Sequence, residues 1–234
     1  MANNAPNPQI PLILTRPLTR ARTFYDGLPA EMQARLLPVF SPLVDIVPRD
    51  VAVPIGSKDA AIFTSQSAVA AGPDGAGRVA YCVGPATTRA AEARGWQAQQ
   101  VGHDANSLVA GLISHPPAAR LVHVSGAHTR GDVAVRLGRA GLTVDHIVVY
   151  DQVLRPLKPA ACEAITRESR VIVPLFSPRT AIQFAKTAPR ATSICVAALS
   201  PTVAEAAAPI ALGGLRIASA PNASALCDAI RGLL

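Results

Sequence analysis

DAAIFTSQSAVAAGPDGAGRVAYCVGPATTRAA, residues 59–91, decides the fold, because residues 170–205 repeat its pattern. Each stretch reads as an apolar strand, a turn with small hydroxyl residues, a helix, a second apolar strand, another small turn and another helix. Phe63-Thr64-Ser65 matches Phe176-Ser177-Pro178 at an offset of 113 residues, and Gly84-Pro85 matches Ser200-Pro201 at an offset of 116. A repeat of this length indicates a duplicated domain rather than a solenoid unit.

Strands that alternate with helices predict parallel sheets covered on both faces. The fold class we expect is therefore α/β, with two similar parallel-sheet domains, one of them discontinuous, joined by a two-stranded β-ladder. The expected bounds are a middle domain at 49–142, an outer domain at 11–41 and 155–234, linker strands at 42–48 and 143–154, and a flexible tail at 1–10.

The apolar runs predict the individual strands and helices. Between residues 18 and 37 the helical spacing is interrupted by Gly27 and Pro29, so we expect two helical pieces there. The expected strands lie near residues 11–14, 60–63, 79–83, 97–101, 120–125, 171–175, 193–197 and 215–219.

Composition narrows the class of protein. The net charge is +7, but basic residues are scattered singly and aromatics make up only 4%, which argues against nucleic-acid binding. Only three of the 22 basic residues are Lys and the rest are Arg. This preference for Arg is explained either by a polyanionic ligand or by a GC-rich genome. There is no signal-peptide pattern and no run of ~20 apolar residues, so we expect a soluble, cytoplasmic protein. The four cysteines read as small core residues, with no metal-ligand spacing.

Six turns combine small or hydroxyl residues with the end of a strand. A helix N-terminus leaves backbone N–H groups unpaired and carries partial positive charge, so a carboxylate or phosphate can bind there. Ser and Thr at such places also serve as ordinary N-caps. Because the turns recur at equivalent places in both halves, we expect them to face a cleft between the two domains. The turns are residues 15–17, 64–67, 84–88, 125–128, 177–180 and 200–202.

Catalytic candidates are few. The chain has no Gly-x-Ser-x-Gly elbow, Walker A loop or Gly-x-Gly-x-x-Gly motif. His115 and His123 read as structural, whereas His128 lies in one of the six turns. Tyr150 lies on the returning linker strand, where two readings stay open. Its hydroxyl points into the space between the domains, or its ring packs on the linker ribbon.

Taken in order, several motifs resemble those of the uroporphyrinogen-III synthase family. They are TRP after the first strand, D-x-x-IFTSQSAV, VGPATTRAAEARG, SG…R…L…AGLTVDHIVVY and FSPRTA, and the match runs from about Leu12 to Leu234. The resemblance implies a cytoplasmic enzyme of tetrapyrrole (heme, siroheme or cobalamin) biosynthesis that needs no cofactor. Its substrate is hydroxymethylbilane, a linear tetrapyrrole with an acetate and a propionate on each ring. The enzyme removes water, inverts ring D and closes the macrocycle to uroporphyrinogen III.

The resemblance also implies roles for single residues. Tyr150 assists the departing water, and Thr87, the second catalytic candidate, matches a hydroxyl position in the Gly-x-x-Thr turn. At the partner turn the chain departs from the family, because Thr202 is followed by Val203 rather than a second hydroxyl. The implied substrate-binding residues are Arg16, Thr64, Ser65, Ala86, Gly126, Ala127, His128, Arg130, Ser177 and Thr202.

The resemblance implies no metal, no nucleic acid and no membrane among the partners. We expect a monomer that receives its substrate by transient hand-over from hydroxymethylbilane synthase. The chain shows no clear nucleophile, and this suits a reaction directed by orientation of the substrate. The alternative is a non-catalytic synthase-like protein that binds a tetrapyrrole or another anion.

Overall fold

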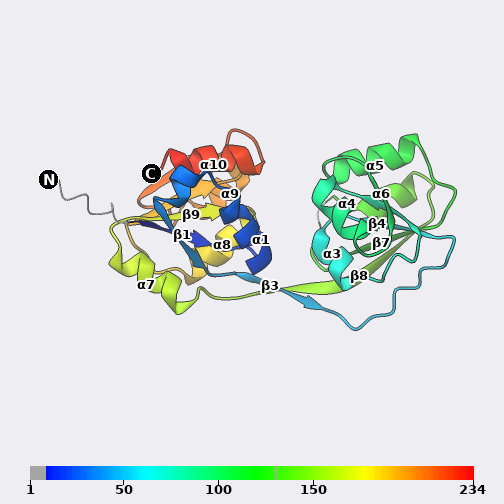
Figure 1. The fold of residues 1–234 in the computed structure, drawn as a ribbon, viewed down its shortest axis with the longest axis horizontal. Helices are drawn as coiled ribbons and strands as arrows, with labels where there is room; N and C mark the ends of the chain where they lie inside the picture. Colours follow the sequence, from blue (N-terminus) through cyan, green and yellow to red (C-terminus); the bar gives the residue numbers. More distant parts are fainter. Residues whose placement is uncertain (1–8, 130) are drawn as a thin grey trace. The chain divides into compact units, whose positions relative to one another are not determined.

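The computed structural model describes residues 9–129 and 131–234. This part of the chain forms two compact units: unit 1 runs to Asp45 and resumes at Leu154, and unit 2 spans Ile46–Val153. In Figure 1 the blue and the yellow-to-red segments build unit 1, and the cyan-to-green segment builds unit 2. Of the predicted tail, residues 1–8 lie outside the described residues, and Ile10 already belongs to the first strand.

The described part of unit 1 is built on a five-stranded parallel sheet in the order β11-β10-β9-β1-β2. The strands are β1 (Ile10–Leu14), β2 (Leu36–Phe40), β9 (Val171–Leu175), β10 (Ile194–Ala198) and β11 (Gly214–Ile217). The helices are α1 (Leu18–Asp26), α2 (Ala30–Gln33), α7 (Pro159–Arg167), α8 (Pro178–Thr187), α9 (Pro201–Ala207) and α10 (Ala223–Arg231).

The described part of unit 2 holds a six-stranded sheet in the order β3-β8-β7-β4-β5-β6. From β8 to β6 the neighbouring strands are parallel. The strands are β3 (Val44–Pro48), β4 (Ala60–Phe63), β5 (Val79–Cys82), β6 (Gln97–Gln100), β7 (Leu121–Gly126) and β8 (Val144–Leu154). The helices are α3 (Gln66–Ala71), α4 (Gly84–Glu92), α5 (Ala105–Ser114) and α6 (Val133–Arg139).

Strand β3 pairs with β8 at the edge of this sheet. The N–H of Arg49 donates to the carbonyl of Val149 at 2.8 Å, and the N–H of Arg155 donates to the carbonyl of Leu43 at 2.9 Å. Residue numbers therefore rise along one strand as they fall along the other, so the pair is antiparallel. The chain passes between the two units in these strands, and the predicted α/β class with parallel sheets and a β-ladder is confirmed.

Buried apolar residues on both faces of each sheet explain why the strands are central. Every residue of β9 and of β10 is buried, which is the pattern of parallel strands covered by helices on both sides. In unit 1 one core joins the sheet to α7, α8 and α9, and the other joins it to α1 and α10. In unit 2 one core includes α3 and α4, and the other α5 and α6.

The two units share one strand order, but their chains start at different points in it. Unit 2 runs through β4, β5, β6, β7 and β8. Unit 1 places β9, β10, β11, β1 and β2 in the same spatial order. Unit 1 is therefore a circular permutation of unit 2: its first two strands occupy the positions that the last two strands hold in unit 2.

The structure corrects the sequence match by one residue. Ser65 and Ser177 are the equivalent positions, because each is an N-cap whose hydroxyl accepts from the N–H three residues later at 3.2 Å. Their offset is 112, not 113, and Phe63 consequently matches Leu175 at the strand end. The sequence match paired Phe63 with Phe176 because it followed side-chain identity, whereas the cap follows the backbone.

The sequence analysis also missed two elements, β2 and α7. It expected helix up to Leu37, yet the structure ends α2 at Gln33 and starts β2 at Leu36. Pro38 argued against a strand because proline has no N–H to donate to a neighbouring strand. β2 is an edge strand, where a missing N–H is tolerated. Helix α7 begins with Pro159 at a position whose N–H needs no partner within the helix.

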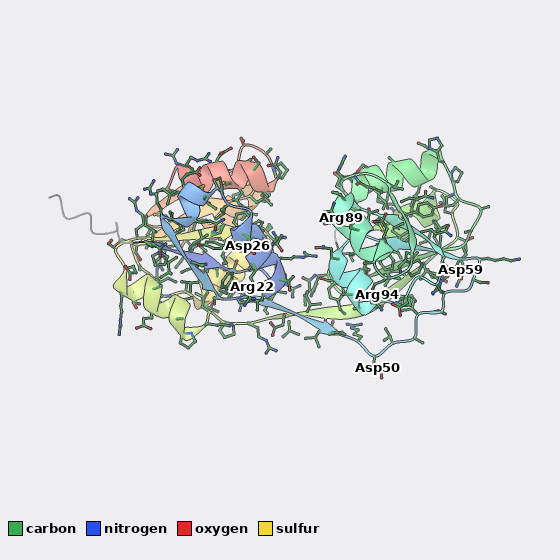
Figure 2. The ribbon with its side chains drawn as sticks, viewed as in Figure 1. Arg22, Asp26, Asp50, Asp59, Arg89 and Arg94 are labelled. Atoms are coloured by element: carbon green, nitrogen blue, oxygen red, sulfur yellow. The ribbon has the colours of Figure 1, made fainter. Side chains whose placement is uncertain are left out.

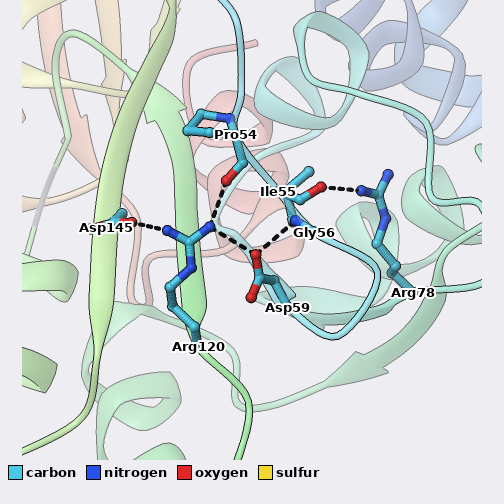
Figure 3. Close-up of polar contacts among 7 residues, drawn as sticks. All are labelled: Pro54, Ile55, Gly56, Asp59, Arg78, Arg120 and Asp145. Atoms are coloured by element: carbon cyan, nitrogen blue, oxygen red, sulfur yellow. Dashed lines mark hydrogen bonds and ion pairs between the residues drawn. The ribbon is translucent and has the colours of Figure 1, made fainter.

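Arg120 ties together the amino ends of three segments in unit 2 (Figure 3). Its Nη2 donates to the carbonyl of Pro54 at 2.6 Å and to the Asp59 carboxylate at 2.7 Å, and its Nη1 donates to the Asp145 carboxylate. The hydrogen bond from Arg120, followed by one from the Gly56 N–H, lowers the pKa of Asp59. This fork anchors the extended segment before β4 to the sheet.

We predict that Asp59→Asn lowers the free energy of unfolding at neutral pH and that the loss shrinks in acid. Because the folded-state pKa of Asp59 is lowered, its contribution is present above its ordinary pKa of about 3.9 and is lost as pH falls through the folded value. Urea unfolding at pH 7, 5 and 3.5 measures the difference between the two proteins.

Asp74→Asn is the matched control, because Asp74 is 77% exposed in its ion pair with Arg94. Exposed pairs contribute little, so this variant should unfold like the parent at each pH. A deficit for Asp59→Asn that stays constant from pH 7 to 3.5 contradicts the assignment.

Candidate active site

Several of the predicted site residues lie where each parallel sheet reverses its winding, and the other described ones lie on or after the next strand of the same sheet. In an open α/β sheet of this order, ligands bind outside the carboxyl ends of the two strands on either side of that reversal. In unit 2 those strands are β4 and β7, and in unit 1 they are β9 and β1. Thr64 and Ser65 follow β4, Gly126 ends β7, and Arg16 follows β1. We define the unit 2 set as Thr64, Ser65, Ala86, Thr87, Gly126, Ala127, His128 and Tyr150. The unit 1 set is Arg16, Ser177 and Thr202.

Tyr150 and Ser65 form the polar centre of the unit 2 set. The Tyr150 hydroxyl lies 3.3 Å from the Ser65 Oγ, and that Oγ also accepts from the N–H of Ala68 at 3.2 Å. Tyr150 is 5% exposed and packs into the core shared with α3 and α4. The ring therefore packs in the core of unit 2 rather than on the linker ribbon, and the hydroxyl is directed to a helix N-cap of the same unit.

Gly126 makes this placement of Tyr150 possible. A Cβ built on Gly126 would lie 2.4 Å from the Cε2 and Cζ of the Tyr150 ring, closer than any real contact. The register of β7 and β8 shifts at this point, so that Gly126 pairs with Tyr150. The N–H of Ala127 donates to the Tyr150 carbonyl at 2.9 Å. Ring and backbone of Tyr150 are thus both held by the turn after β7.

Thr87 and Ala86 occupy the first turns of α4, next to the turn after β4. Thr87 is 6% exposed and its hydroxyl has no hydrogen-bond partner among the described residues, whereas Thr88 Oγ1 donates to the Gly84 carbonyl at 3.0 Å. Gln66 Nε2 donates to the carbonyl of Ala86 at 3.4 Å and joins the starts of α3 and α4. The sequence analysis did not single out Gln66, although it lies within the quoted turn.

His128 and Ala127 are exposed in the turn after β7. The charge of His128 helps to lower the pKa of Asp151, after the larger effect of the hydrogen bond from Arg49. Arg49 donates to both carboxylate oxygens of Asp151, at 2.6 and 2.7 Å. Arg130, which the sequence analysis placed among the substrate-binding residues, lies outside the described residues.

Arg16 is the centre of the unit 1 set. Its Cζ lies 4.3 Å from the centroid of the Phe176 ring, which in turn packs edge-on against Phe24 at 5.0 Å. Among the described residues no carboxylate pairs with Arg16. Burial, and then the charge of Arg20, lower the pKa of Arg16 to about 10, so the guanidinium stays charged at neutral pH. A desolvated cation without a counter-ion favours binding of an anion.

The pairing of β1 with β9, beside this arginine, has fewer registered pairs than the pairing of the equivalent strands β7 and β4 in unit 2. β1 and β9 are registered through the pair Leu12–Ile172, whereas β4 and β7 are registered through four pairs, from Ala60–Leu121 to Phe63–Val124. Pro174 has no N–H to donate to the ladder. The sequence analysis noted Phe176 in the repeat but gave it no role, because its contact with Arg16 depends on the pairing of β1 with β9.

Ser177 and Thr202 complete the unit 1 set. Ser177 caps α8 and its Oγ lies 2.9 Å from the Thr180 Oγ1. The Thr202 hydroxyl lies 3.0 Å from the Ser200 Oγ, so both hydroxyls of that turn are already paired. The backbone N–H groups of the turn, rather than its side chains, are the groups that can face a ligand.

Within the described residues, no cluster of three or more His, Cys, Asp or Glu side chains is arranged to hold a metal ion. No helix in that part of the chain combines the length and the hydropathy that a bilayer span requires. The Cys82 thiol is buried, and burial raises its pKa to about 12, as expected for a core residue rather than a nucleophile.

Fold and site define an α/β protein of two units, in which the carboxyl ends of the parallel strands present hydroxyls, amide N–H groups and one desolvated arginine. The family profile of uroporphyrinogen-III synthase HemD matches residues 33–228. The chain belongs to the uroporphyrinogen-III synthase family and is an enzyme of tetrapyrrole biosynthesis. The resemblance seen in its motifs is thereby confirmed.

One solved structure shows the same fold. The uroporphyrinogen-III synthetase of Helicobacter pylori 26695 aligns over 97% of this chain and 100% of that chain, with a TM-score of 0.66 and 14% identity. A mutant uroporphyrinogen III synthase of the extremely thermophilic bacterium Thermus thermophilus aligns over 96% of this chain and 97% of that chain, with a TM-score of 0.48 and 14% identity. The comparison with curated proteins finds no match.

We predict that Gly126→Ala destabilises the protein by about 1–3 kcal/mol, because the new methyl group displaces the Tyr150 ring from a packed core. Urea unfolding measures this. Gly138→Ala is the control, since a Cβ at Gly138, within α6, meets nothing within 4 Å. Helix propensity makes that variant about as stable as the parent or up to ~1 kcal/mol more stable.

The two substitutions at the contact should also be non-additive. In a Tyr150→Ala background, Gly126→Ala should cost much less, because the ring it displaces is gone. Equal costs in both backgrounds would show that Gly126 is required for another reason.

Proposed function

We propose that this enzyme converts hydroxymethylbilane into uroporphyrinogen III with the unit 2 set around the reacting carbon and both sets holding carboxylates. The observation that carries the proposal is the clustering of Tyr150, Ser65 and Gly126 at the sheet reversal of unit 2. Family membership supports the reaction, and the geometry supports the assignment of residues.

The chemistry asks for little acid–base power. The pyrrole nitrogen of the first ring expels the hydroxyl group of the hydroxymethyl carbon, which leaves as water after taking up one proton, and an azafulvene remains. The substituted carbon of ring D attacks that carbon and forms a spiro intermediate. One bond of this intermediate breaks, ring D turns over, and the chain recloses with loss of a proton. The net change is the loss of one water molecule.

Orientation decides which isomer forms, because the unassisted reaction closes without inversion. When the protein holds the reacting carbons in the productive arrangement, the flexible substrate no longer has to reach that arrangement by chance, and the entropic part of the barrier falls. Fixed N–H groups at the turns after β4, β5 and β7 are suited to this, since they bind carboxylates without rearranging. On this proposal Thr64, Ala86, Ala127 and His128 contribute backbone or side-chain contacts to the substrate.

Tyr150 and Thr87 are the hydroxyl groups we assign to the reacting centre. The Tyr150 hydroxyl helps the water to leave, and Ser65 orients it through their shared hydrogen bond. Thr87 offers a hydroxyl whose hydrogen-bonding capacity no other described residue uses. A neutral donor suits this step because the leaving group needs polarisation and a single proton.

In unit 1, Arg16, Ser177 and the turn at Thr202 bind further carboxylates of the substrate. Arg16 supplies a guanidinium charge to the binding groups of unit 1. Family resemblance further supports a cytoplasmic monomer that receives its substrate by transient hand-over from hydroxymethylbilane synthase. Arg130 is retained as a substrate contact on the same resemblance.

Conversion of hydroxymethylbilane by the purified protein tests the function. We expect the type III isomer after oxidation and chromatographic separation. Type I alone, at the rate seen without protein, would rule out the proposal. Tight binding of the substrate without turnover would instead indicate a binding protein.

We predict that Tyr150→Phe lowers kcat several-fold while the protein stays folded, because only the hydroxyl is removed. Initial rates of uroporphyrinogen III formation and urea unfolding measure the two effects. Tyr81→Phe is the matched control, since Tyr81 is a half-buried tyrosine on β5 outside the unit 2 set. Equal kcat for parent and Tyr150→Phe removes the hydroxyl from the reaction.

We also predict that Arg16→Met raises KM about tenfold, the loss of one charge-assisted contact to the substrate. Arg22→Met is the control. Arg22 lies on α1 (Figure 2), with its Cζ 5.9 Å from the centroid of Phe40, but we assign it no substrate contact. The same KM for Arg16→Met and Arg22→Met would contradict a binding role for Arg16.

A further inference from the structure

We propose that His146 and Ser125 are positioning residues that set the Gly126 peptide and, through it, the place of Tyr150. This inference goes beyond the proposed function and rests on it only for the consequence in catalysis. None of the roles assigned above uses either residue.

His146 is held flat against a second histidine. His123 on β7 and His146 on β8 are registered partners, with ring centroids 5.0 Å apart and an angle of 18° between the planes. His123 is 2% exposed and neither ring nitrogen has a hydrogen-bond partner. Burial, and then the charge of His146, lower the pKa of His123 to about 4. A neutral His123 therefore acts as a flat plate that fixes the plane of His146.

The stacked His146 ring aims Nε2 at a buried hydroxyl. That nitrogen lies 2.6 Å from the Ser125 Oγ, and the Ser125 Oγ lies 3.1 Å from the Gly126 carbonyl oxygen. Ser125 has one proton to give. Both contacts are hydrogen bonds only when His146 Nε2–H donates to Ser125 and Ser125 donates to Gly126. If Nε2 is unprotonated, Ser125 turns to the ring and the carbonyl loses its donor.

Gly126 connects the two faces of the sheet. Side chains alternate along β7, so Ser125 and His123 lie on the face of Leu121, which packs with α5 and α6. Tyr150 packs on the opposite face with α3 and α4, where its ring covers Gly126. The Ser125 hydroxyl holds the Gly126 carbonyl from one face of the sheet. It therefore also fixes the backbone against which the Tyr150 ring packs on the other face.

The Tyr150 ring is packed against the Gly126 backbone in the core of unit 2, so its position depends on the orientation of the Gly126–Ala127 peptide. The Ala127 N–H, next along the chain, donates to the Tyr150 carbonyl. A rotation of the Gly126–Ala127 peptide would break that bond and tilt the ring, which moves the hydroxyl relative to Ser65. His146 is exposed, so it can be replaced without opening the core.

Two substitutions of His146 separate the donor from the stack. His146→Phe keeps a flat ring against His123 but cannot donate, and His146→Gln keeps a donor at similar reach but cannot stack as a ring. Protein labelled with 3-fluorotyrosine gives 19F signals for its three tyrosines, assigned by single Tyr→Phe variants. We expect His146→Phe to move the Tyr150 signal and to lower kcat about threefold to tenfold, with KM unchanged.

Rescue by the donor is the decisive result. His146→Gln should leave both the Tyr150 signal and kcat close to the parent, and Ser125→Ala should resemble His146→Phe. His115→Phe replaces another exposed histidine of unit 2 and should change neither. The proposal is overturned if His146→Phe leaves the Tyr150 signal in place, or if His146→Gln moves it equally.

Failure of the proposed function would look different. If the 19F signal responds to His146 as expected but Tyr150→Phe keeps full kcat, the positioning of Tyr150 stands and its part in the reaction does not. If Tyr150→Phe lowers kcat and the signal ignores His146, the reverse holds.

Discussion

The contact between the Tyr150 ring and Gly126 is the constraint on which the unit 2 set depends. A glycine at the end of β7 lets the ring lie against the backbone, and the shift of register brings Tyr150 opposite it. The hydroxyl then reaches the N-cap of α3 at Ser65. A larger residue in place of Gly126 would displace the Tyr150 ring and with it the contact between the Tyr150 hydroxyl and Ser65.

The two units share one strand order but present different groups at the reversal of the sheet. Each unit places an N-cap serine after one strand of the reversal, Ser65 after β4 and Ser177 after β9. The neighbouring strand supplies a different group in each. In unit 1 it supplies the charged Arg16 on an aromatic ring, and in unit 2 it supplies Gly126 beneath Tyr150. The two reversals therefore share an N-cap serine and differ in the group beside it.

The sequence predicted the strands and the hydroxyl turns well, because both follow from local patterns: buried apolar runs, and Ser or Pro at helix starts. It did not predict β2, where Pro38 is tolerated only because the strand lies at the sheet edge. Nor did it predict the partners of Tyr150 and Arg16. Those contacts depend on a register shift and on the pairing of β1 with β9, which join residues distant in the chain.

The hydroxyls of Tyr150 and Thr87, which we assign to the reacting centre, suit a reaction in which the substrate carries its own driving group. The pyrrole nitrogen expels the hydroxyl, so the protein's part is to hold carbons in place and to favour one of two closures. Groups that do not titrate near neutral pH do this best, since their hydrogen bonds keep the same direction throughout the reaction. On the proposed assignment, rigid packing of Tyr150 against Gly126 contributes to catalysis, because orientation is the quantity that selects the isomer.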